Sequence, residues 1–408
     1  MRTNNSEERG KTTSKFRFRL PSSGLLPLFM LAHFSHHLVT ALPIPLLPLI
    51  RDDFALNYTR SGFVISAFNL PYGFCQLPAG WLADRIGPRI LITIGICGVA
   101  LAGFLIGFSQ TYVMLLTFLA LMGVLGGGYH PSSPPLISAS VKAKNRGRAL
   151  GLHLIGGSAS YFIVPLIAAV IAATWGWRGS FIILAIPAMV FGIIFYLFLG
   201  QWIKTKKTEH SVVGIPKEIP STQSQWRYLA PFLILTTFHA AVFFSIISFI
   251  PLFLVDHFGI AEGTAAALVA VIYSSGLWAS VLGGYLSDRL GKVPVVLVVC
   301  FIAGPIIYLL NLAPYGLGIG VVLVLIGMLI YIRMPASESY IISHVSERHR
   351  STVLGIYYFG NLEGAGVLTP IMGYLIDQFG FQLSFTIAGA ALVAVTVVCA
   401  IFLWGRPD

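Results

Sequence analysis

Charged residues are scarce in this sequence of 408 residues. Asp, Glu, Lys and Arg together make up 10% of the chain, whereas a soluble domain carries about 25%. Hydrophobic residues make up 56%, which is more apolar surface than a water-soluble fold can bury. The composition excludes an ordinary soluble protein and predicts a membrane protein that crosses the bilayer several times.

Cysteines are few, and motifs for cofactors are missing. The four cysteines stand in apolar runs without metal-ligand spacing, so we expect packing thiols. The sequence has no nucleotide-binding P-loop, and ATP is not expected to drive the protein directly. No cofactor and no metal site are expected. Residues 1–24 are polar and basic, and the apolar run after them is long enough to span, which excludes a cleavable signal peptide.

Twelve apolar stretches are long enough to cross the hydrocarbon, which takes about 20 helical residues. They fall near residues 25–49, 60–83, 90–108, 112–138, 149–174, 179–201, 229–254, 263–286, 293–311, 315–341, 352–376 and 382–404. The sequence therefore predicts an all-α membrane protein with twelve transmembrane helices.

The basic residues gather on one side of this topology. If the N-terminus is cytoplasmic, 22 of the 26 Lys and Arg residues lie in cytoplasmic tails and loops. Arg51, Arg60 and Arg178 lie on the other side, and Arg333 lies inside a span. This bias predicts a multi-pass protein of the plasma (inner) membrane with both termini in the cytoplasm. It also accounts for the net charge of +11, so nucleic acid is not expected as a partner.

The two halves of the chain repeat each other. The segment GWLADRIG at 80–87 recurs as GYLSDRLG at 284–291, an offset of 204 residues. The same offset relates DDF at 52–54 to DHF at 256–258 and WGW at 175–177 to FGF at 379–381. Transporters built from such repeats hold substrate near the midplane, between the halves, and rock the halves against each other. The expected divisions are an N-terminal tail (1–24), two six-helix bundles (25–201 and 229–404), a linker (202–228) and a C-terminal tail (405–408).

The repeated loops carry the signature G-x-L-a-D-R-x-G-R/K, by which the chain resembles the major facilitator superfamily of secondary transporters. The signature residues in the two copies are Gly80, Asp84, Arg85, Gly87, Gly284, Asp288, Arg289 and Gly291. The resemblance covers the chain outside the N-terminal tail and the linker. It implies that these two loops latch the cytoplasmic gate in the outward-open state.

Two local features refine this resemblance. Gly80 and Gly284 would let two helices approach closely at the gate. The tract of Tyr129, His130, Pro131 and Ser133 is similar to one in fosmidomycin-resistance-type exporters, which also carry a histidine in the first span. The tract is short, so it indicates a subfamily and no particular substrate.

Ionisable side chains inside the membrane are rare and usually carry function. At mid-depth the sequence places His33, His36 and His37 in the first span, His239 in the seventh and Glu363 in the eleventh. His130 and Arg333 lie nearer the cytoplasm.

Each of the two charged groups has competing interpretations. Glu363 is predicted to couple transport to protons or to bind a cationic group of the substrate, and the alternative is a buried, protonated carboxyl. Arg333 cannot deprotonate and offers five donors to an anion. Its alternatives are an ion pair with Glu338 or Glu363, or a side chain extended toward the cytoplasm.

The histidines have three interpretations. His33 and His37 are four residues apart and share one helical face, so we expect at least one of them to line a cavity with His239. Proton coupling or binding of an acidic substrate suits a group that titrates near neutrality. A metal site is disfavoured because zinc sites usually add Cys or carboxylate ligands, and packing is the third interpretation.

Together these features predict a secondary active transporter rather than an enzyme. We expect it to move a small organic solute, anionic or amphipathic, by alternating access and with proton coupling. A metal-cation carrier and a non-transporting membrane sensor are the alternatives. The expected partners are the small-molecule substrate, protons and the lipid bilayer, and the expected state is a monomer.

Overall fold

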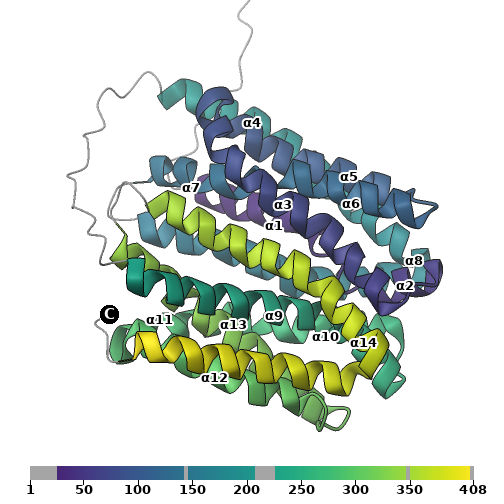
Figure 1. Cartoon of the computed structure of the whole chain (residues 1–408). Coiled ribbons are helices and arrows are strands. Elements are labelled where there is room, and N and C mark those ends of the chain that lie inside the picture. Colours follow the sequence, from purple (N-terminus) through teal and green to yellow (C-terminus); the bar gives the residue numbers. More distant parts are fainter. Residues whose placement is uncertain (1–24, 142–145, 207–225, 346–349, 405–408) are drawn as a thin grey trace, which may run out of the picture.

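The computed structural model describes residues 25–141, 146–206, 226–345 and 350–404, and no strand occurs within them. Figure 1 shows the helices packed side by side along one common direction. The predicted N-terminal tail, the C-terminal tail and most of the predicted linker lie outside the described residues.

The first half of the described chain holds the expected first six spans. Its elements are α1 (Leu25–Thr40), α2 (Leu47–Phe54), α3 (Tyr58–Ile86), α4 (Pro88–Thr93), the π-helical turn η2 (Ile94–Gly98), α5 (Val99–Gly107), α6 (Tyr112–Gly126), α7 (Tyr129–Ser140) and α8 (Arg146–Lys206). The first span ends at Thr40 because a proline-rich segment follows, and the chain becomes helical again as α2, with Pro48 in its first turn.

The second half holds the other six spans. Its elements are α9 (Trp226–Phe258), α10 (Glu262–Ser274), the 3-10 turn η5 (Ser275–Leu277), α11 (Ala279–Leu290), α12 (Lys292–Leu309), α13 (Leu317–His344) and α14 (Arg350–Leu403).

Helices α8 and α14 each bend sharply at one glycine. Gly176 has φ 67° and ψ 176°, and Gly380 has φ 74° and ψ 172°. This backbone region is open essentially to glycine alone. The two glycines are the central residues of the repeated WGW and FGF segments, so each long helix comprises two spans joined at a repeat-related turn.

Eight stretches of the described residues are long and apolar enough to cross a membrane. Those in α8 and α14 have 54 and 49 residues, which is enough for two crossings each at about 20 residues per crossing. The remaining two spans are α1, which has 16 residues, and α3. The prediction of twelve transmembrane helices is confirmed.

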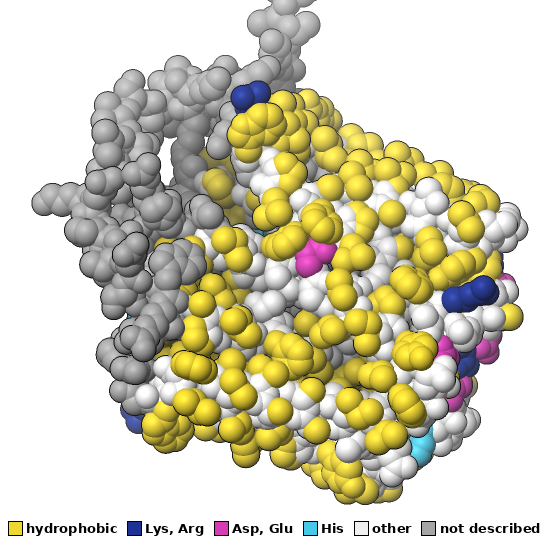
Figure 2. All heavy atoms as spheres, viewed as in Figure 1, with side chains coloured by type: hydrophobic (Ala, Val, Ile, Leu, Met, Phe, Trp, Pro, Cys, Tyr) yellow, Lys and Arg dark blue, Asp and Glu magenta, His cyan; other side chains and the backbone are white. Residues whose placement is uncertain are grey.

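The outer surface is apolar, as a lipid-facing surface must be. Figure 2 shows one face covered by hydrophobic side chains, with a group of charged side chains gathered at the end where α2 lies. Val170, Val281 and Ile401 expose 72%, 76% and 73% of their surface. Such exposure would be unfavourable in water and is neutral against lipid chains.

Candidate functional site

A cavity of about 350 Å³ lies between the two halves of the chain. Its walls combine apolar side chains with imidazole, amide and hydroxyl groups. Its polar lining residues are His37, Thr40, Asn69, Tyr72, Gln76, His130, Ser133, His153, Tyr161, Tyr358 and Asn361. Among the described residues, no Asp, Glu, Lys or Arg side chain lines this cavity.

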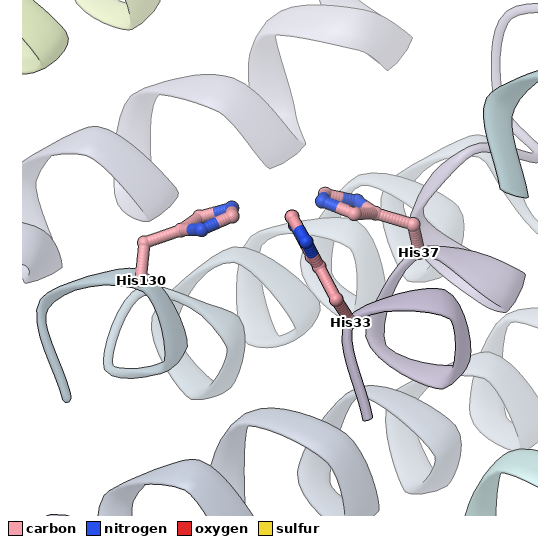
Figure 3. A group of neighbouring side chains, drawn as sticks. All are labelled: His33, His37 and His130. Carbon is pink, nitrogen blue, oxygen red and sulfur yellow. The ribbon is translucent and has the colours of Figure 1, made fainter. Parts of the chain in front are cut away.

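Three of the predicted histidines meet beside the cavity, and two of them, His37 and His130, line it. His33 and His37 come from α1, one turn apart, and His130 comes from the start of α7. One ring nitrogen of each lies within 4.8 Å of the others, and Figure 3 shows the three rings directed toward one another. The predicted cavity role of the first span therefore has a geometric basis in this cluster.

Hydrogen bonds favour a proton on Nδ1 of both His33 and His37. Nδ1 of His33 lies 2.9 Å from the carbonyl oxygen of His153, which can only accept. Nδ1 of His37 lies 2.9 Å from the hydroxyl of Thr40, and that hydroxyl donates its own hydrogen to the His36 carbonyl. In the neutral rings Nδ1 is therefore the donor, and Nε2 keeps a free lone pair.

Two further histidines belong to the same group of rings. His153 of α8 stacks on His33 with ring centroids 4.3 Å apart and donates through Nδ1 to the Phe29 carbonyl at 3.0 Å. His36 donates through Nδ1 to the Gly95 carbonyl at 2.8 Å and accepts from the Tyr72 hydroxyl at 2.9 Å. Both nitrogens of His36 are thus occupied. Sequence reasoning gave His153 no role, because nothing in periodicity brings α8 against α1.

Local irregularities in the helices build this cluster. Gly95 lies in the π-helical turn η2, and such turns are frequent at functional sites. The fourth span breaks between α6 and α7, at Gly127 and Gly128, and His130 follows this break. Gly127 packs so closely on α3 that a Cβ there would lie 2.8 Å from the Tyr72 carbonyl oxygen.

In the other half, Arg333 of α13 is buried without a countercharge. Its Nη1 donates to the Thr236 carbonyl at 3.1 Å and to the Tyr357 hydroxyl at 3.3 Å. No carboxylate of the described residues lies within 4.0 Å of it. The ion pair with Glu338 or Glu363 that was one interpretation of Arg333 is therefore not formed. Glu338 instead accepts from the Tyr358 hydroxyl at 2.8 Å.

His239 and Glu363 lie apart from the histidine cluster. His239 of α9 stacks on Phe243, 4.3 Å between centroids, and neither of its ring nitrogens has a hydrogen-bond partner. Glu363 of α14 packs against Gly73 of α3, so it sits where the two halves touch. Neither residue is among those that line the cavity, although Asn361 and Leu362 are.

The two copies of the signature motif have matching backbones. Gly87 and Gly291 end their helices with φ 90° and 92°, which favours glycine. The Arg85 guanidinium lies 4.0 Å from the Trp81 ring centroid, and that of Arg289 lies 4.8 Å from the Tyr285 ring centroid. The close helix approach predicted at Gly284 is absent, because a Cβ there would meet nothing within 4 Å. The environments of Gly80 and Asp84 lie outside the described side chains, and Asp288 makes no ion pair with the described residues.

The two halves are joined by hydrogen bonds at the end where α2 lies. Arg51 pairs with Asp256, and the Tyr58 hydroxyl donates to Asp256 at 2.8 Å. The Asp377 carboxylate accepts from the backbone N–H groups of Tyr58 and Thr59, both at 2.9 Å, at the N-terminus of α3.

Arg51 stays charged in this contact. Burial alone would lower the pKa of Arg51, but its bonds to Asp256 and Asp52 outweigh burial and raise the pKa. Sequence reasoning did not assign this contact, although the repeated DDF and DHF segments contain Asp52 and Asp256. Among the described residues, no side-chain hydrogen bond joins the halves at the opposite end.

Two six-helix halves around a central cavity, with a lipid-facing surface, define a membrane transporter. Residues 29–334 and 232–408 match the sequence pattern of the Major Facilitator Superfamily. The chain belongs to this superfamily, which confirms both the resemblance and the prediction of a transporter rather than an enzyme.

Several curated proteins are similar over most of their length. A probable sulfoacetate transporter of Cupriavidus necator is 26% identical, over 87% of each chain. A probable L-galactonate transporter of Escherichia coli is 24% identical, over 95% of this chain and 90% of that one. The fosmidomycin resistance protein of Escherichia coli is 23% identical, over 94% and 93%, so the expected similarity to that type is confirmed.

A solved structure has the same fold. A bacterial homologue of the human lysosomal transporter Spinster, in an inward-facing and occupied conformation, superimposes with a TM-score of 0.75. It covers 94% of this chain and 96% of that one at 18% identity.

Proposed function

We propose that this protein is a secondary transporter of small organic anions, coupled to protons. The observation that carries the proposal is a cavity between the halves whose lining, among the described residues, includes three imidazoles and no carboxylate. A wall without acids does not repel an anion, and imidazoles can take up protons as the anion enters. The names of two relatives, which specify sulfoacetate and L-galactonate, agree with a solute of this class.

Neutral donors in the cavity suit the oxygens of such a solute. The side-chain nitrogens of Asn69 and Gln76 are buried and have no hydrogen-bond partner. Both residues line the cavity, and a carboxylate or sulfonate would satisfy donors that are otherwise costly to bury. Arg333 adds a positive charge behind this wall, where its neighbour Met334 lines the cavity.

The proposed cycle is alternating access. The halves touch through Arg51, Asp256 and Asp377 at the end of α2, which is the outer end in the predicted topology. The cavity in this conformation would therefore exchange solute with the cytoplasm. Glu363 packs on α3 across the boundary between the halves, so we propose that protonation of Glu363 is linked to their separation.

Flux measurements in proteoliposomes test this proposal. Purified protein would be reconstituted and supplied with labelled sulfoacetate or L-galactonate, with and without a pH gradient. We expect accumulation that follows the gradient and collapses with a protonophore. Glu363→Gln should remove the effect of the gradient while exchange of solute persists. Arg333→Ala removes the positive charge behind the cavity wall, and the loss of about 1 kcal/mol of favourable charge interaction should raise KM roughly fivefold.

Two controls keep this test specific. Arg333→Lys retains the charge and should recover part of the lost affinity. His257→Asn changes an exposed histidine outside the cavity and should leave flux unchanged. Absence of flux for any organic anion would contradict the proposal, and gradient-driven uptake by Glu363→Gln would contradict the role of Glu363.

A further inference from the structure

We propose that His33, His37 and His130 form a binding site for a divalent transition-metal ion of the zinc class. The fourth coordination position of this ion would face the central cavity. The sequence predicted no metal site, because no Cys or carboxylate lies near these histidines. The structure supplies instead three imidazoles from two helices, which are a sufficient ligand set when the fourth position is left open.

The positions of the protons on His33 and His37 determine which ring nitrogens are available to bind an ion. The Nδ1–H groups of His33 and His37 are bound to the His153 carbonyl and the Thr40 hydroxyl. This leaves Nε2 of each of these two rings as the nitrogen available to an ion, and one ring nitrogen of each of the three histidines lies within 4.8 Å of the others. Among the described residues, no hydrogen bond connects the three rings to one another or holds either nitrogen of His130. A lone pair without a partner in the membrane interior costs free energy, and a bound cation would provide that partner.

The outer partners resemble those of metal-bound histidines. Such a ligand usually donates its second ring nitrogen to a carbonyl, a carboxylate or water, which fixes the tautomer and the ring orientation. His33 has a backbone carbonyl in this role. His37 has a hydroxyl that is itself oriented by the His36 carbonyl. The second shell is therefore in place for two of the three ligands.

The spacing fits an ion after a small contraction. Three atoms that all lie within 4.8 Å of one another have a point between them that is at most about 2.8 Å from each, whereas zinc–nitrogen bonds are about 2.0–2.1 Å long. The nitrogens would have to approach the ion by at most about 0.7 Å. The His130 ring, which no hydrogen bond of the described residues holds, can provide much of this movement by rotation.

The charge of the bound ion predicts which group would occupy its fourth coordination position. Three neutral imidazoles leave a bound ion with two uncompensated positive charges in the membrane, which is unfavourable. No acid lines the cavity among the described residues, so an oxyanion from solution must supply the balance. Because this step rests on the proposed function, we infer that the carboxylate or sulfonate of the transported anion completes the coordination.

The test uses untagged, purified full-length protein and Co²⁺ as the probe. Four-coordinate Co²⁺ absorbs strongly in the visible region, so binding is read without any measurement of transport. We expect one Co²⁺ per chain, displaced by Zn²⁺, and a spectrum that changes when sulfoacetate is added. His33→Asn and His37→Asn keep an amide nitrogen at the Nδ1 position and remove only Nε2. Loss of an outer-shell partner lowers metal affinity about 10–100-fold. Each of these two variants removes a direct ligand and should lower the affinity for Co²⁺ by more than that.

Matched variants decide the outcome. His36→Gln changes a buried histidine of the same cluster whose nitrogens are both occupied, and it should keep Co²⁺ binding. Thr40→Val should weaken binding about tenfold. Failure to bind Co²⁺ and Zn²⁺, or equal binding by His33→Asn and His37→Asn, would overturn the site. If anions that the protein transports do not change the Co²⁺ spectrum, the inference that the anion coordinates the ion is wrong. The proposal that the protein transports organic anions would not be affected by this result.

Discussion

The position of the His33 ring is controlled by a single glycine on the neighbouring helix. A Cβ at Gly157 of α8 would lie 2.5 Å from Cε1 of His33. The ring cannot move away freely, because it stacks on His153 and donates to the His153 carbonyl. Glycine at position 157 therefore leaves the space that the His33 ring occupies.

We therefore expect Gly157→Ala to displace the His33 ring and to weaken solute binding. The displaced ring would disturb His37 and His130, which pack on His33 and line the cavity, and a loss of about 1 kcal/mol of binding free energy would raise KM for the transported anion roughly fivefold. Uptake kinetics in proteoliposomes measure this. Gly151→Ala on the same helix is the control, since a Cβ there meets nothing within 4 Å, and its KM should not change. Normal kinetics in Gly157→Ala would show that the ring position is unimportant.

At the scale of the element, the repeat predicted more than the hydrophobic pattern did. Apolar stretches located the spans, but only the offset of 204 residues related Gly176 to Gly380, and both prove to be turns between two spans. Periodicity also placed His33 and His37 on one face of α1. It could not give the rotation of one helix against another, so it missed His153 beside His33 and expected His239 to line the cavity, which it does not. That information is present only in the packing.

The turn glycines should be intolerant of any side chain. A residue with a Cβ held at φ 74° and ψ 172°, as at Gly380, costs about 1–3 kcal/mol. We expect Gly380→Ala to lower the thermal unfolding midpoint in detergent, and Gly176→Ala to do the same. Gly355 of α14 is helical and faces open space, so Gly355→Ala should leave stability unchanged or raise it by about 0.5–1 kcal/mol. Equal melting of Gly380→Ala and Gly355→Ala would contradict this account of the turn.

At the scale of the whole molecule, the contacts between the halves are unequally distributed. The closed end uses carboxylates of the second half, Asp256 and Asp377, against Arg51 and the N-terminus of α3 in the first. The side chains of Arg51 and Asp256 are 15% and 26% exposed, so each contact is worth less than a buried ion pair. A few such contacts give a closed state that is preferred but can still open.

Removing both carboxylates should shift the molecule toward opening at this end. Asp256→Asn combined with Asp377→Asn keeps the shape of the side chains and removes the charges. We expect a loss of about 1–2 kcal/mol, which changes the ratio of closed to open states about tenfold. Spin labels at Gln110 and Leu312, both exposed, would report a larger population of long distances between the halves. Asp53→Asn is the matched control, because Asp53 pairs with Arg178 of its own half at 2.8 Å and should not alter the distances. If the double variant has the same distance distribution as the unmodified protein, these carboxylates do not hold the two halves together.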